Sequence, residues 1–130
     1  MNQAILRVAL VDDEEGVRKA LGRLLRSAGI EVAASFSSGR DFLGAAEGLR
    51  LDCLVLDLHM PAMSGLEVHQ ELVRSGSRLP VVIITGHDKP EYRAQALGAG
   101  VAAYLPKPVD AKVLLAAIAA AAAGTKSALT

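Results

Sequence analysis

Five polar side chains in this sequence could act together chemically. Three are the carboxylates of Asp12, Asp13 and Asp57, and the others are the hydroxyl of Thr85 and the ammonium of Lys107. Crowded carboxylates repel one another unless a cation neutralises them, and such oxygen ligands suit Mg²⁺ or Mn²⁺. A lysine and a hydroxyl beside the ion would offer charge compensation and a hydrogen bond to an incoming phosphoryl group. One carboxylate could itself be the nucleophile and form an aspartyl phosphate.

Each of these polar residues follows a short apolar run that is typical of a buried strand. The five runs of the chain cover residues 6–11, 30–34, 51–56, 80–84 and 101–105. Helical patterns separate and follow them, over residues 17–28, 38–48, 64–75, 89–98 and 110–123. Gly29 is placed to end the first helix, and Ser38, Ser64 and Asp110 are placed to cap three others.

The first helical pattern is the clearest. Its apolar stripe consists of Val17, Ala20, Leu21, Leu24, Leu25 and Ala28. This spacing predicts one buried face, with Arg18, Lys19 and Arg26 turned outward as a solvated face.

Five strands that alternate with five helices predict a parallel sheet with right-handed crossovers, a doubly wound α/β domain. In such folds, ligands bind beyond the carboxyl ends of the strands, where the strand order reverses. The five polar residues should therefore converge at one edge. The second strand ends in Ser35-Phe36 and offers no charge, as expected of an edge strand away from the site.

Length and composition predict one globular domain over residues 1–124, with residues 125–130 as a C-terminal tail. Of the 130 residues, 52% are hydrophobic and 22% are charged, which argues against disorder. The formal net charge is zero, so no basic excess favours direct binding to nucleic acid or to an anionic membrane. The chain has no leader pattern and no apolar run of spanning length, so we expect a cytoplasmic protein. The single cysteine, Cys53, is expected to be an inert core residue.

Four motifs at the strand ends resemble the receiver domain of two-component response regulators, over residues 5 to about 123. They are LVDDEE, LDLHMPAMSGLE, VVIITGH and GAGVAAYLPKP, in that order along the chain. The wording ITGH is similar to receivers of the nitrogen-fixation regulator type. The resemblance implies a flavodoxin-like fold with the strand order 2-1-3-4-5.

The resemblance also implies a metal-dependent phosphoacceptor site. Asp57 would be the phosphoacceptor. Asp12 and Asp13 would hold Mg²⁺ together with Asp57 and the backbone carbonyl of His59.

Further roles follow from the resemblance for residues near the fourth and fifth strands. Thr85 would donate its hydroxyl to the phosphoryl group, and Lys107 would pair with it. The Lys107–Pro108 bond would be cis and would aim the ammonium into the site. Tyr104 would be an aromatic switch that turns inward when Thr85 moves, and Gly86 would leave room for a phosphodonor.

The function implied is a signalling module rather than an enzyme with an external substrate. It would take a phosphoryl group from a sensor histidine kinase or a histidine phosphotransfer protein onto Asp57 and lose it to water. One alternative is a Mg²⁺-dependent phosphatase, although His59 stands where its best-known family has a second aspartate and the chain has no room for a cap domain. Another is a docking module that never turns over phosphate.

Several of these residues also have simpler interpretations. Asp12 and Asp13 could cap the first helix, Lys107 could be a solvated lysine, and Tyr104 could be ordinary packing. His69 is expected to be exposed in the middle of its helix, among polar neighbours. The basic residues of the first helix are expected to be solvated, although partner kinases of this family often dock beside that helix.

Two further hypotheses go beyond the motifs. Residues 113–123 read VLLAAIAAAAA, and such a smooth apolar helix predicts a homodimer or effector surface formed by the fourth helix, fifth strand and fifth helix. Alanine's high helix propensity is the simpler explanation. His59 and His87 each follow a site residue by two positions, and we expect them to slow dephosphorylation when they are protonated.

Overall fold

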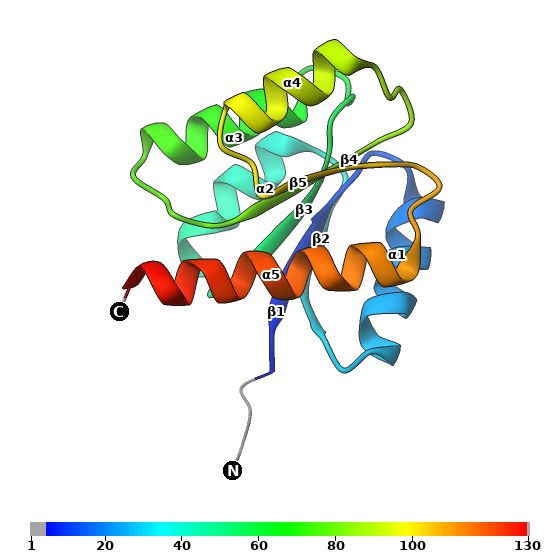
Figure 1. Ribbon diagram of the computed structural model, residues 1–130, viewed down its shortest axis with the longest axis vertical. Helices are drawn as coiled ribbons and strands as arrows, with labels where there is room; N and C mark the ends of the chain where they lie inside the picture. The colour runs from blue at the N-terminus through cyan, green and yellow to red at the C-terminus, as the bar shows by residue number, and fades with distance from the viewer. Residues whose placement is uncertain (1–4, 130) are drawn as a thin grey trace.

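The computed structural model is a five-stranded parallel sheet in the order β2-β1-β3-β4-β5. It describes residues 5–129, with side chains to residue 124. The strands are β1 (Arg7–Val11), β2 (Glu31–Phe36), β3 (Cys53–Asp57), β4 (Val81–Thr85) and β5 (Ala103–Pro106). The helices are α1 (Glu15–Ser27), α2 (Gly39–Ala45), the 3₁₀ turn η1 (Ala46–Gly48), α3 (Gly65–Arg74), α4 (Pro90–Gly98) and α5 (Ala111–Leu129). The predicted fold class and strand order are confirmed (Figure 1).

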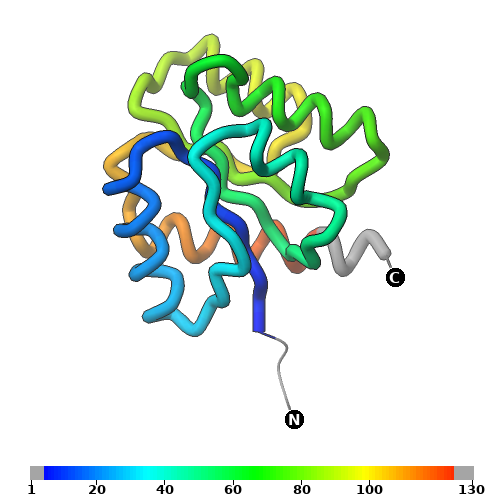
Figure 2. Tube along the Cα trace, turned by 180° about the vertical axis from the view of Figure 1, so that it is seen from behind, coloured from blue at the N-terminus to red at the C-terminus, as the bar shows by residue number. Residues whose placement is uncertain are grey.

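Two apolar cores lie on the two faces of the sheet, because neighbouring residues of a strand point to opposite sides. On one face, alternate strand residues pack against Phe42 of α2, Val68 of α3 and Ala96 of α4. On the other face, the remaining strand residues pack against Leu25 of α1 and Ile118 of α5. The helices accordingly form one layer on each side of the sheet (Figures 1 and 2). This double cover explains why β3 and β4 are apolar at nearly every position.

The predicted helix ends are largely confirmed by hydrogen bonds. The Ser38 hydroxyl accepts from the Asp41 amide at 3.1 Å, and Asp110 Oδ1 accepts from the Val113 amide at 3.0 Å. Ser64 and Glu67 form a reciprocal capping box at the start of α3. Gly29 adopts φ 81° just after α1, the left-handed conformation that favours glycine at a helix end.

Two expectations about helices α1 and α5 are wrong. The last helix was expected to stop at residue 123 but runs to Leu129, so the backbone of 125–129, expected as a tail, is helical. In α1 the expected apolar stripe is too wide, because Ala20 and Ala28 are exposed while Gly22 is buried. Alanine is compatible with either side of a helix, so its position did not define the stripe.

The expectation that His69 is exposed is also wrong, since only 6% of it is accessible. Glu67, Gln70 and Glu71 near it are polar, but Gly65, Val68, His69 and Leu72 follow the spacing of one helical face. That face is the one that α3 turns toward the sheet, so helical geometry rather than local polarity decides its burial.

Within residues 5–129, no helix combines the length and the apolar character needed to cross a membrane.

Gly65 connects the end of β3 to α3 at very close range. Its amide donates to the Leu58 carbonyl at 2.9 Å. A Cβ at position 65 would lie 2.4 Å from the carbonyl oxygen of Asp57, which is backbone and cannot move aside cheaply. The start of α3 can therefore approach the end of β3 only with glycine at this position.

We predict that Gly65→Ala lowers the free energy of unfolding by about 2–4 kcal/mol, because the new methyl group forces the β3–α3 connection apart. Gly44→Ala in α2 is the matched control, since nothing lies within 4 Å of a Cβ there. This control should be neutral or should stabilise the protein by up to about 1 kcal/mol. Urea unfolding followed by circular dichroism measures both, and equal midpoints would contradict the predicted clash.

Candidate functional site

The carboxyl ends of four strands bring the five predicted polar residues to one edge of the sheet. Asp12 directly follows β1, and Asp57 and Thr85 are the last residues of β3 and β4. Lys107 follows β5. Asp12, Asp13 and Asp57 each offer a carboxylate oxygen, and these three oxygens lie within 4.8 Å of one another. The structure thus assembles the constellation expected from the sequence.

The Lys107 ammonium lies among the carboxylates. Its Nζ is 2.9 Å from Asp12 Oδ2, 3.4 Å from Asp57 Oδ1 and 3.5 Å from Glu14 Oε1. Burial by itself would lower the pKa of Lys107, but the hydrogen bond to Asp12 and the negative charges of Asp57 and Asp12 raise it on balance. Lys107 is therefore a firmly protonated cation at the centre of the site, and the alternative of a solvated lysine is wrong.

The repulsion between the acids is seen most clearly in the raised pKa of Asp57. It is 3% exposed, and its pKa is raised to about 7. Burial is the largest cause, and the charge of Asp12 adds to it, while Lys107 acts in the opposite direction. One lysine therefore does not balance the acids, and a further cation would favour the ionised form of Asp57.

Asp12 is buried, and hydrogen bonds to its side chain and to its backbone hold it in place. It is 1% exposed, and its Oδ1 accepts from the Glu14 amide at 2.9 Å. Its carbonyl accepts from the Arg18 guanidinium at 2.6 Å. Oδ2 has the close ion pair with Lys107 but no well-formed hydrogen bond among the described residues. This buried oxygen already pairs with the Lys107 ammonium, and its remaining lone pairs could also bind a metal ion.

The donor set fits a hard divalent ion. Three carboxylates of which one is exposed and two are buried suit Mg²⁺, which prefers a few carboxylate oxygens and keeps several waters. The residue at the N-cap position of α1 is Glu14, and its side chain forms no capping hydrogen bond. The alternative that Asp13 is the capping residue is therefore not supported. The role of the His59 carbonyl in metal binding stays a prediction.

Thr85 lies fully buried beside the lysine. Its Oγ1 accepts from the His87 amide at 3.0 Å, and its carbonyl accepts from the Lys107 amide at 2.7 Å. A Cβ added at Gly86 would find only Lys107 Cδ, at 4.0 Å, so the space expected there is open. The Lys107–Pro108 peptide bond is cis, as expected.

The two histidines expected beside the site contact each other. The ring centroids of His59 and His87 are 5.1 Å apart in an edge-to-face arrangement, and Tyr92 of α4 packs on His59 at 4.8 Å. Partial burial, followed by the charges of His87 and Lys89, lowers the pKa of His59. The pH dependence expected from these histidines is not tested by this geometry and stays a prediction.

Sequence reasoning missed three contributors to the site. Glu14 adds a fourth acid near Lys107, and its position in the run DDEE was the available signal. Arg18 was placed on a solvated face, yet it holds the Asp12 carbonyl. Tyr92 lies 33 residues beyond His59, and no local pattern links the two.

Comparison with known proteins decides the family. The model of the response regulator receiver domain matches residues 8–119. The chain belongs to the response regulator receiver family. The resemblance seen in the sequence is therefore confirmed.

The curated relatives of this receiver domain are response regulators that are longer than the matched region. The response regulator protein TmoT of Ectopseudomonas mendocina is 38% identical over 118 residues, which cover 91% of this chain and 53% of TmoT. The transcriptional regulatory protein FixJ of Azorhizobium caulinodans is 37% identical over 113 residues, which cover 87% of this chain and 53% of FixJ. The chain thus spans about half the length of the curated relatives it matches.

Solved structures share the receiver fold. The crystal structure of FixJ-N is 36% identical with a TM-score of 0.85, covering 92% of this chain and 95% of that one. The signal receiver domain of NarL from Mycobacterium tuberculosis is 28% identical with a TM-score of 0.87, covering 94% and 99% respectively.

Tyr104 of this receiver domain is turned inward. It is 2% exposed, and the Arg93 guanidinium lies 5.7 Å from its ring centroid and 3.3 Å from its carbonyl oxygen. Burial is the main reason that the pKa of Tyr104 is raised. The switch role stays a prediction, because one conformation does not test a movement.

We predict that Asp57→Asn stabilises the metal-free receiver at alkaline pH. The raised pKa means that Asp57 contributes stability below its ordinary pKa of 3.8, and that this stability is lost as the pH rises through about 7. In EDTA at about pH 8, the variant should exceed the wild type by roughly 1–3 kcal/mol in unfolding free energy, with a smaller gap at about pH 5.

Urea unfolding at the two pH values measures this effect, with exposed Asp41→Asn as the control. Added Mg²⁺ should stabilise the wild type more than Asp57→Asn. A gap that does not change with pH would show that ionisation of Asp57 is not the cause.

Proposed function

We propose that this receiver accepts a phosphoryl group on Asp57 from a sensor histidine kinase or a histidine phosphotransfer protein. The observation that carries the proposal is the buried Asp57 carboxylate, with Lys107 Nζ 3.4 Å from its Oδ1 and two further aspartates within reach. A nucleophile with a cation and a potential metal site around it is what phosphoryl transfer requires.

In the transfer, a carboxylate oxygen of Asp57 attacks the phosphorus of a phosphohistidine. The new O–P bond forms as the N–P bond breaks, and the electron pair of that bond leaves with the imidazole of the donor. The Lys107 ammonium compensates the charge of the arriving phosphoryl oxygens, and the Thr85 hydroxyl donates a hydrogen bond to one of them. Asp12, Asp13 and Asp57 would hold Mg²⁺, which would supply additional neutralisation of this charge.

The phosphatase alternative has less support. A phosphatase that works through an aspartyl phosphate needs a general acid beside the nucleophile, and the place two residues later is taken by His59. That imidazole is exposed and packs against His87 and Tyr92. We propose instead that the only chemistry of this domain is its own phosphorylation and dephosphorylation.

We predict that the wild type gains one phosphoryl group when it is incubated with acetyl phosphate and Mg²⁺. Asp57→Asn should gain none, because the amide is not a nucleophile here, and omission of Mg²⁺ should slow the reaction by at least about tenfold. Intact-mass spectrometry measures the increment, and Asp41→Asn is a control that should behave as the wild type. Sustained turnover of phosphomonoesters would favour the phosphatase, and a wild type without any increment would favour the docking module.

The contact of His59 with His87 and Tyr92 supports a second proposal, that these rings limit the access of water to the phosphorylated site. We predict that His59→Asn with His87→Ala shortens the lifetime of phospho-Asp57 several-fold, because both rings that we propose to limit the access of water are removed. Decay measured by intact mass after removal of the donor tests this. An exchange of an exposed residue in the 3₁₀ turn η1, Glu47→Gln, is the control, and an unchanged lifetime in the double variant would make the rings bystanders.

We also propose that α4, β5 and α5 form the surface through which this receiver contacts a second copy or an effector. Large apolar side chains remain exposed on this side, with Leu97 of α4 at 42% and Val113 of α5 at 49% accessible. Tyr104 belongs to β5, between α4 and α5 in the sequence, and its side chain is buried. Because β5 pairs with β4, the strand that ends at Thr85, Tyr104 connects this surface to the site. A second chain that packed on this side would bury both side chains, and burial of apolar surface favours association.

We predict that beryllofluoride with Mg²⁺, a stand-in for the phosphoryl group, shifts the wild type toward a dimer in sedimentation velocity. Leu97→Glu should abolish the shift, because it places a charge in the apolar contact. Val73→Glu is the matched control, since Val73 is equally apolar and 56% exposed on α3. A wild type that stays monomeric at all concentrations, with no partner lost on Leu97→Glu, would contradict the proposal.

A further inference from the structure

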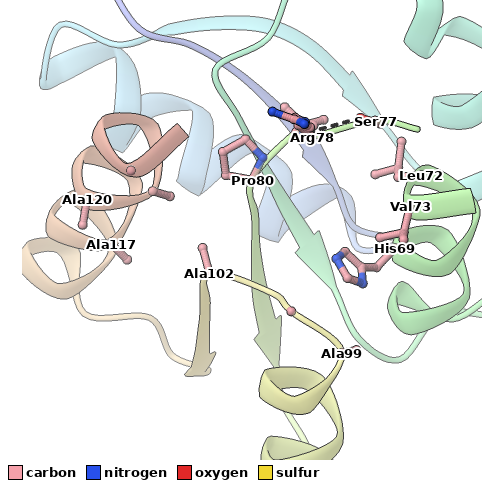
Figure 3. A pocket seen from close by; sticks show the side chains of 14 residues that line it. His69, Leu72, Val73, Ser77, Arg78, Pro80, Ala99, Ala102, Ala117 and Ala120 are labelled. Atoms are coloured by element: carbon pink, nitrogen blue, oxygen red, sulfur yellow. Dashed lines mark hydrogen bonds between the residues drawn. The ribbon is translucent and has the colours of Figure 1, made fainter. Parts of the chain in front are cut away.

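A hollow of about 630 Å³ lies at the end of the sheet opposite to Asp57. It opens between α3, the residues that lead into β4 and β5, and α5 (Figure 3). Its volume falls in the range of small-molecule sites. The hollow shares no residue with the cluster of Asp12, Asp13 and Asp57, so it is a separate feature of the domain.

Small side chains create the hollow. On the side of α5 it is lined by Ala117, Ala120 and Gly124, and below β5 by Ala99 and Ala102. Larger residues at these positions would fill the space between α3 and α5. The walls are completed by apolar groups such as Leu72 and Pro80, so a bound molecule would have an apolar body.

His69 supplies an unsatisfied polar group in this apolar setting. It is 94% buried, and its Nδ1 has no hydrogen-bond partner among the described residues. Figure 3 shows its ring leaving α3 toward Pro80 and Ala102, with Ala117 and Ala120 across the hollow. Burial lowers the pKa of His69, so at neutral pH the ring is neutral, with one N–H donor and one acceptor nitrogen. An unpaired buried nitrogen is costly, and a ligand atom would remove that cost.

Arg78 gives the hollow a positive charge. Its side chain is exposed, lines the hollow, and forms no ion pair with the acidic residues of the described chain. The residues that line the hollow, all of them described, include no aspartate and no glutamate. The charge complement of this site is therefore an anion.

We propose that this hollow is a binding site for a small carboxylic acid with an apolar body. The apolar body lies against the alanines of α5 and against Pro80. The carboxylate pairs with the long side chain of Arg78 and accepts the N–H of His69. The site does not depend on phosphorylation of Asp57, so the unphosphorylated protein is sufficient to test it.

Benzoate is a suitable probe, because it combines an aromatic ring with one carboxylate. A ligand of this size should bind with a dissociation constant on the order of 0.1–1 mM. In two-dimensional amide NMR of the full chain, benzoate should cause saturable shifts at residues 69–80 and 99–102 and in α5. Benzyl alcohol, which has no charge, should bind at least about tenfold more weakly.

Three variants separate the contributions. Arg78→Ala should weaken benzoate binding at least about tenfold, whereas Arg40→Ala, which removes an exposed arginine of α2 outside the hollow, should not change it. His69→Phe keeps a ring in place but removes the N–H, and should weaken binding several-fold. Ala120→Leu should narrow the hollow on the side of α5 and weaken binding several-fold. Thermal unfolding of each variant confirms that it is folded.

The proposal is overturned if benzoate causes no saturable shifts well above the expected dissociation constant, or if Arg78→Ala binds it as the wild type does. It is also overturned if shifts occur but spread over the surface without saturation. The hollow could instead be occupied by a second copy of the chain, and sedimentation of the wild type and of Ala120→Leu tests this. A dimer that Ala120→Leu disrupts, without any benzoate binding, would assign the hollow to a second copy of the chain.

Discussion

The repulsion between carboxylates at the ends of β1 and β3 is the interaction on which the site depends. Two of these acids are almost fully buried, and one lysine partly balances them. The imbalance is visible in Asp57, whose pKa rises to about 7 despite the nearby Lys107. A site in this condition favours anything that adds positive charge, and it holds Asp57, the nucleophile that we propose, close to the groups that could stabilise a phosphoryl group. The repulsion between the carboxylates both lowers the stability of the metal-free fold and underlies the chemistry that we propose.

The rest of the domain keeps these charges in place. In the parallel sheet, β3 pairs with both β1 and β4, so Asp57 is fixed between the ends of its two neighbours. Apolar layers cover both faces of the sheet and leave the strand ends as the place where polar groups can gather. Gly65 then allows α3 to start directly against the Asp57 carbonyl.

The two ends of the sheet differ in chemistry, and α3 connects them. Its first residue touches the backbone of Asp57, while His69 and Leu72 in its next two turns line the hollow at the opposite end. One end concentrates charge around Asp57. The other end has small apolar walls, a His69 Nδ1 without a hydrogen-bond partner and an Arg78 guanidinium without an ion pair, both among the residues that the structure describes. A ligand in the hollow would contact α3 and α5, and α5 also belongs to the surface that we propose for partners.

The sequence by itself determined the layered fold, the order of elements and the identity of the five polar site residues. These features are set by local patterns, since apolar periodicity defines strands and helices and the residue after each strand lies at a known edge. Only the tertiary structure decided how close the groups come. The distances from Lys107 to two aspartates, the bond from Arg18 to the Asp12 carbonyl and the contact of Tyr92 with His59 all join residues from different elements. It also decided that His69 is buried and that the alanines of α5 border a hollow, because alanine fits a buried or an exposed position equally well and only the neighbouring helices and strands determine which one it occupies.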